Sequence, residues 1–254
     1  MTVPSNEMAS VMYSRQAMRF PEHMLIIGRT SSGKSSLVGH ILSNIDHLYH
    51  RQSKDNIVIV LSPHDVIDRN FLRRFNSLED WKILHFTIES LNADSMGNVL
   101  KYLKKEDILK KEVFLFLDDL AIDGYSSKRT NGFILKAFAT FRHQNIAVIA
   151  TVQTGDKEFK PLMENSGYVI LMKHFGYHKC LEMILRTFVM SIKVPTLIRS
   201  LSHFFDSTGR IGDHIAFNFS PSAMKNEIFF ITNGVFEPHC GYTREDIEQL
   251  CLNL

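Results

Sequence analysis

Residues 23–44 read HMLIIGRTSSGKSSLVGHILSN, and they are the most informative part of the chain. The apolar run 23–27 predicts a buried strand, and the run 35–44 predicts a helix. Between them, residues 28–35 match the pattern G-x-x-x-x-G-K-[ST], the phosphate-binding loop or Walker A motif. Its two glycines let the backbone turn tightly, so that N–H groups and the positive end of the following helix can surround phosphate oxygens. The stretch therefore predicts a strand–loop–helix unit that binds a nucleotide such as ATP.

Each residue type in this loop has an expected role. Lys34 reaches the β- and γ-phosphates, and the Ser35 hydroxyl binds Mg²⁺. The residues expected to surround the nucleotide are Gly28, Arg29, Thr30, Ser31, Ser32, Gly33, Lys34, Ser35 and Ser36. The alternative is a Ser- and Gly-rich loop with an incidental lysine.

The rest of the chain alternates short apolar runs with longer amphipathic ones. Strands are expected at 56–61, 83–86, 113–117, 146–151 and 168–172, and helices at 94–105 and 131–143. Runs that are apolar on both faces are typical of parallel strands covered by helices. The pattern therefore predicts an α/β P-loop fold with a mostly parallel central sheet flanked by helices.

The two ends of the chain differ from this pattern. Residues 1–20 show no clear period and are interpreted as an N-terminal arm, with residues 21–254 forming the P-loop domain. The C-terminal part begins at about residue 205. The last third predicts helices within 178–202, a β-hairpin of 215–219 and 228–231, and a closing helix over 242–252 with Thr243 as its N-cap.

Composition narrows the functional classes. The 254 residues are 44% hydrophobic and 22% charged, as in globular proteins, and include three cysteines, none in a CxxC pair. This argues against a disulfide scaffold or a zinc ribbon and favours a reducing compartment. No apolar run reaches the length of about 18 residues that a membrane-spanning helix needs, and we expect no secretion signal. His40, His47 and His50 lack a Cys or carboxylate to complete a ligand set, so no metal cluster is expected.

A Mg²⁺ ion bound by Ser35 needs a carboxylate, which we expect on a strand neighbouring the phosphate-loop strand. The apolar run 113–117 delivers Asp118 and Asp119 at its carboxyl end, the edge where ligands bind in open α/β sheets. We assign Asp118 to the Mg²⁺ shell, as the Walker B residue. Asp119 would polarise the attacking water, or alternatively cap the next segment.

Gln153 ends the apolar strand Ile146–Val152, so it should emerge at the same edge. A terminal glutamine there would sense the γ-phosphate or orient water. The alternative is a loop amide that is hydrogen-bonded to the backbone.

Taken in order, these motifs resemble the viral genome-packaging ATPases of the FtsK–HerA superfamily, of the poxvirus and Polinton-like type. The resemblance covers about residues 24–235 and rests on Phe116–Leu120, Phe141–Ile149 and Thr151–Gln153, supported by Met163–Met172 and the closing hairpin. One departure is Asp119, which stands where the family pattern has Glu.

The resemblance implies an ATP- and Mg²⁺-dependent motor that pumps double-stranded DNA into a capsid. It implies a homo-oligomeric ring, hexameric or pentameric, and capsid or portal-vertex proteins as partners. The expected location is the host cytoplasm or nucleus, or the virion. The net charge of +2 neither demonstrates nor opposes DNA binding.

By the same resemblance, Arg142 lies near a subunit interface. It is the candidate for an arginine finger that acts on a neighbour's nucleotide, the alternative being a salt-bridged or phosphate-binding surface arginine. In the polar segment 123–132, Lys128 and Arg129 would contact DNA phosphates, or the segment is simply a surface loop.

Two other function classes stay open at this point. A nucleotide or nucleoside kinase fits the chain length, although no Arg-rich lid is evident. A nucleotide-switched binding or assembly protein would need little water activation, so the pair Asp118 and Asp119 argues against it.

Overall fold

The computed structural model describes most of a central α/β body. The described residues are 18–43, 45, 49–51, 56–62, 81–87, 93–108, 111–118, 138–153, 160–173, 176–188, 195, 198–199, 202, 214–219, 227–232, 235–236 and 242–243. The strands are β1 (Met18–Arg19), β2 (Met24–Ile27), β3 (Tyr49–His50), β4 (Asn56–Ser62), β5 (Trp81–Thr87), β6 (Val113–Leu117), β7 (Ile146–Val152), β8 (Tyr168–Met172), β9 (His214–Asn218), β10 (Glu227–Thr232), β11 (Val235–Phe236) and β12 (Tyr242–Thr243). The helices are α2 (Lys34–Ser43), α5 (Ala93–Lys105), α7 (Lys160–Glu164) and α8 (Tyr177–Phe188), and residues 138–142 are also helical.

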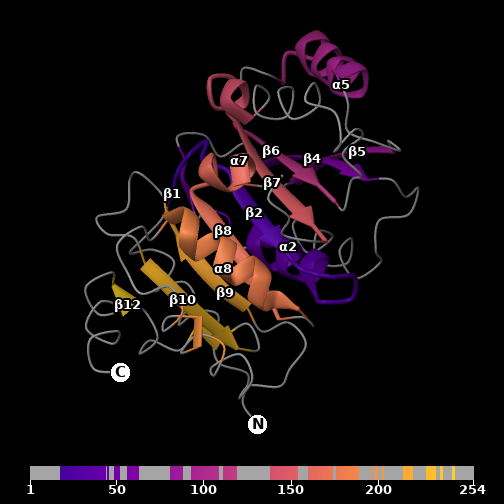
Figure 1. Ribbon diagram of the computed structural model, residues 1–254. Coiled ribbons are helices and arrows are strands. Elements are labelled where there is room, and N and C mark those ends of the chain that lie inside the picture. Colours follow the sequence, from indigo (N-terminus) through magenta and orange to yellow (C-terminus); the bar gives the residue numbers. More distant parts are fainter. Residues whose placement is uncertain are drawn as a thin grey trace.

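One large sheet organises these elements (Figure 1). Its strand order is β11-β10-β9-β8-β2-β7-β6-β4-β5, and β12 also pairs with β10. The strands from β8 to β5 in this order are all parallel, whereas β9 and β10 continue the sheet in antiparallel fashion. The phosphate-loop strand β2 therefore lies inside the sheet, between β7 and β8.

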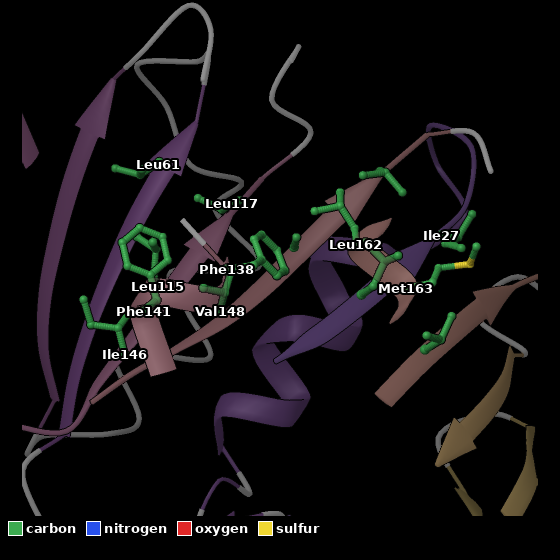
Figure 2. Packing of buried hydrophobic residues seen from close by; sticks show 14 of the residues in the cluster. Ile27, Leu61, Leu115, Leu117, Phe138, Phe141, Ile146, Val148, Leu162 and Met163 are labelled. Carbon is green, nitrogen blue, oxygen red and sulfur yellow. The ribbon is translucent and has the colours of Figure 1, made fainter. Parts of the chain in front are cut away.

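Alternate residues of each central strand enter one of two apolar cores. On one face, Leu25 and Ile27 pack in a cluster that includes side chains of α5, α7, α8 and residues 138–142. Figure 2 shows part of this cluster, with Ile27, Phe138 and Met163 among the labelled side chains. On the other face, Met24 and Ile26 pack in a cluster that includes α2. Each buried aliphatic or aromatic side chain contributes roughly 1.5–3 kcal/mol relative to exposure. This two-sided burial holds the strand ends, and hence the loops that follow them, in place.

Helix α2 forms because its apolar residues lie on one side. Leu37, Val38 and Ile41 recur at helical spacing and are buried against the sheet. No acidic residue occupies its first turn, so no carboxylate of that turn neutralises the positive end of the helix dipole.

The end of the expected N-terminal arm is part of the folded body. β1 pairs in parallel with β3, and the Phe20 ring packs edge-on against Tyr49 and Phe114, with ring centroids 6.2 and 5.3 Å apart. The Tyr49 hydroxyl donates to the backbone oxygen of Glu22 over 3.2 Å. These contacts lie at the amino edge of the sheet, away from the phosphate loop.

The expected α/β fold, with a mostly parallel sheet and a C-terminal hairpin of β9 and β10, is confirmed. The expected helices 94–105 and 35–44 correspond to α5 and α2. At the C-terminus, Tyr242–Thr243 form strand β12, and the remainder of the expected closing helix lies outside the described residues. None of the helices that the structure describes is long and apolar enough to cross a membrane.

Candidate nucleotide-binding site

The carboxyl ends of β2, β6 and β7 bring the sequence-predicted groups to one edge of the sheet. The chain leaves β2 at Gly28, whose N–H donates to the Val152 oxygen at the end of β7 over 3.0 Å. Asp118 follows β6, and its N–H donates to the Leu61 oxygen of β4 over 2.9 Å. These backbone bonds attach both loops to neighbouring strands just where the strands end.

The phosphate loop has the tight backbone that its glycines predict. A Cβ on Gly28 would lie 2.6 Å from Ser32 Oγ and 2.7 Å from Met172 Cβ, so no side chain fits there. Gly33 has a φ of 95°, a conformation that side chains strongly disfavour. Ser31 has a φ of 64°, in the left-handed region that only a few per cent of non-glycine residues adopt. The loop therefore curls back over its own start.

Lys34 lies at the centre of this curl. Its side chain is buried, and Nζ donates to the Gly28 oxygen over 2.7 Å and to the Arg29 oxygen over 3.1 Å. The first turn of α2 follows at once, with Leu37 N–H bonded to the Gly33 oxygen over 2.9 Å. The Lys34 ammonium group and the positive end of α2 thus lie at the same loop. Their combined positive charge favours the binding of an anion such as a phosphate.

Ser35 and Asp118 meet although they are far apart in the sequence. Ser35 Oγ donates to Asp118 Oδ1 over 3.4 Å. Neighbouring oxygen ligands of an octahedral Mg²⁺ lie about 3 Å apart, given metal–oxygen distances of about 2.1 Å. Hydroxyl and carboxylate oxygens are ligands that Mg²⁺ accepts, so this pair fits the ion. Among the described residues, no group of three or more His, Cys, Asp or Glu side chains could hold a metal.

The expectation that Asp118 lies on a strand next to the phosphate-loop strand is wrong. β7 lies between β2 and β6, pairing with both in parallel. Asp118 nevertheless reaches Ser35 across the end of β7. The β7 residue beside Asp118 is Thr151, whose Oγ1 lies 3.2 Å from Asp118 Oδ1 and 3.3 Å from the Leu117 oxygen. Thr151 belongs to the motif Thr151–Gln153, but no role for it follows from the sequence pattern. The available signal was that Thr151 is the one polar residue in the strand IAVIATV.

Gln153 occupies the expected edge. It follows β7 directly and is exposed. Asp119, Lys128 and Arg129 lie outside the described residues, so their expected roles stay predictions.

Arg142 lies at the opposite, amino edge of the sheet, shortly before β7 begins at Ile146. It is half-buried, and Nη2 donates to the Asn165 oxygen in the turn before β8. The structure therefore does not bring Arg142 to the phosphate loop of its own chain. An action on a neighbouring subunit's nucleotide stays a prediction.

His23 is a buried residue of this amino edge that sequence reasoning did not single out. Val148 N–H donates to its Nδ1 over 3.1 Å, so the ring proton is on Nε2, which contacts the Phe138 oxygen at 2.6 Å. Burial lowers the pKa of His23 to about 4; the Phe138 bond opposes this shift, and the nearby positive charge of Arg142 adds to it. His23 is therefore neutral at physiological pH and serves the fold.

Several solved structures have a fold similar to that of this chain. The DNA-packaging ATPase B204 of Sulfolobus turreted icosahedral virus matches with a TM-score of 0.54, over 85% of this chain and 98% of that chain, at 14% sequence identity. The fold is similar to that of a viral genome-packaging NTPase. The B204 protein of Sulfolobus turreted icosahedral virus 2 matches in complexes with ATP-gammaS (TM-score 0.52, 12% identity, 84% of this chain and 97% of that chain) and with AMPPCP (TM-score 0.54, 12% identity, 83% and 97%). No protein-family model matches the chain, and no curated protein matches its sequence.

Proposed function

We propose that this chain is an ATP-hydrolysing motor that moves double-stranded DNA into a viral capsid. The observation that carries the proposal is the meeting of Ser35 and Asp118, 3.4 Å apart, at the phosphate loop. It lies in a fold similar to that of B204, which is described as a DNA-packaging ATPase. The motif order supports the finer assignment to the poxvirus and Polinton-like type of the FtsK–HerA superfamily.

The residues of the loop bind and orient the triphosphate. Lys34 and the first turn of α2 place positive charge where the β- and γ-phosphates would lie. Ser35 and Asp118 would hold Mg²⁺, which when bound neutralises charge on the transferring phosphoryl group. Asp119 would polarise and position the attacking water, and Gln153, at the same edge, would report the γ-phosphate to the parts that contact DNA.

Assembly supplies the remaining parts of the proposed motor. A homo-oligomeric ring would place Arg142 of one subunit against the nucleotide of the next, where its charge stabilises the transition state. Lys128 and Arg129 would contact DNA phosphates in the channel, and capsid or portal-vertex proteins would hold the ring. These roles rest on the family resemblance.

The test is the ATPase rate as a function of added double-stranded DNA, with particle size followed by light scattering. We expect DNA to stimulate hydrolysis and nucleotide to promote assembly, while Lys34→Ala loses about 100-fold or more in rate. Equal rates with and without DNA, from a protein that stays monomeric with nucleotide, would contradict the proposal. Transfer of the γ-phosphate to a nucleoside instead of water would point to a kinase.

A further inference from the structure

Strand β7 separates the phosphate-loop strand from the strand of Asp118, and the hydroxyl of Thr151 on β7 lies against the Asp118 carboxylate. Thr151 is buried, with 2% of its surface exposed, in a strand whose other residues are apolar. A buried hydroxyl costs free energy unless it is hydrogen-bonded. Its position at the level of Asp118 therefore needs an explanation in terms of the groups around it.

The contacts of Thr151 point to the carboxylate. Its Oγ1 lies 3.2 Å from Asp118 Oδ1, the same oxygen that accepts from Ser35 Oγ, and 3.3 Å from the Leu117 oxygen. A hydroxyl has one proton, so it serves one of these acceptors at a time. A bond to the charged oxygen is stronger than a bond to a neutral one. The carboxylate oxygen is thus the favoured acceptor.

We infer that Thr151 is a positioning residue for the metal ligand Asp118. The backbone of Asp118 is held from β4, through its N–H bond to the Leu61 oxygen, while Thr151 holds the carboxylate from β7. Together they keep Oδ1 facing Ser35 Oγ before a metal–nucleotide complex binds. The inference rests on the proposed nucleotide site and adds a residue that the phosphate-loop and Walker B patterns do not contain.

The test compares Thr151→Val, which keeps the shape but removes the hydroxyl, with Thr151→Ser, which keeps the hydroxyl. The measurement is the magnesium concentration that gives half of the ATPγS-induced rise in melting temperature. Loss of a group that orients a metal ligand typically weakens metal binding about 10- to 100-fold. We expect a shift of that size for Thr151→Val and none for Thr151→Ser. ATPγS binding in EDTA should be the same in all three proteins.

The outcomes separate this inference from the proposed function. A wild-type magnesium requirement in Thr151→Val would overturn the role of Thr151 alone. A loss that Thr151→Ser shares equally would also overturn it, because the hydroxyl would not be the cause. Absence of any magnesium-dependent ATPγS binding in the wild-type protein would overturn the proposed function itself. If Thr151→Val does not fold, Thr151→Ala provides the same comparison.

Discussion

Gly28 begins the phosphate loop at a point where a side chain has no room. An added Cβ would meet Ser32 Oγ at 2.6 Å and the Met172 side chain at 2.7 and 2.9 Å. We expect Gly28→Ala to lower the free energy of unfolding by about 1–3 kcal/mol, as overpacking does. Urea denaturation without nucleotide measures it.

Gly97 provides a matched control within the same protein. It lies inside α5 with nothing within 4 Å of an added Cβ. Gly97→Ala should therefore raise the free energy of unfolding by about 0.5–1 kcal/mol, because alanine favours the helix. A similar loss from both substitutions would show that the close contacts at Gly28 do not decide its effect.

At the residue scale, the sequence predicted the phosphate loop in most detail. The roles of Gly28, Gly33 and Lys34 depend on the backbone of one short segment, which the local pattern describes. The sequence did not predict the role of Thr151, because its partner Asp118 follows a different strand. Periodicity shows which side chains of a strand share a face, but it does not show which strand pairs alongside.

At the scale of elements, His23 connects the start of β2 to β7 and to the helical residues 138–142. Its pKa is about 4 in the folded protein, against the ordinary 6.5 in the unfolded chain, so the unfolded state binds more protons between these values. This contribution to stability is complete above pH 6.5 and is lost as the pH falls toward 4. From pH 7 to pH 5 we expect a loss of about 2 kcal/mol from this residue.

The measurement is the free energy of unfolding against pH, for the wild type and for His23→Asn. The asparagine cannot titrate but can still accept a hydrogen bond from Val148 N–H. Its pH dependence between 7 and 5 should be flatter by the contribution of His23. Parallel curves for the two proteins would show that His23 does not carry this dependence.

A buried ion pair connects the residue after β3 to the start of β6. Arg51 Nε lies 3.4 Å from Glu112 Oε2, their side chains are only 3% and 10% exposed, and the guanidinium also lies over the Phe114 ring. Removing one partner of such a buried pair takes away the opposite charge from the other and typically costs about 3–5 kcal/mol. We expect this loss for Glu112→Gln by urea denaturation.

The double substitution Arg51→Met with Glu112→Met should cost less than the sum of its two single substitutions, since no charge is left behind. Additive losses would mean that the two side chains act independently. The sequence did not indicate this pair, because Arg51 and Glu112 are far apart in the chain.

At the scale of the whole molecule, the position of Arg142 permits two roles that one experiment separates. Its guanidinium holds the Asn165 oxygen at the amino edge, far from the phosphate loop of the same chain. If it also acts across a subunit interface, mixing Arg142→Ala with Lys34→Ala should create sites that combine an intact loop with an intact arginine. The mixture should then hydrolyse ATP faster than either protein alone.

A role confined to the fold predicts a different result. The mixture would show no gain in ATPase rate, and Arg142→Ala alone would have a lower melting temperature. The control is Arg142→Lys, which keeps the charge but loses the planar guanidinium that suits a phosphoryl transition state.

The local chemistry of the chain was sufficient to predict the α/β class, the phosphate loop and the strand that delivers Asp118. Apolar runs, glycines and a terminal carboxylate are properties of short segments, and short segments are what a single sequence describes. Only the folded sheet showed three further features. These are the position of β7 between β2 and β6, the hydrogen bond from Thr151 to Asp118, and the place of Arg142 at the amino edge. They depend on which strands pair with which. Strand pairing is decided by how the helices cover both apolar faces of the sheet, and a single segment of sequence does not contain that information.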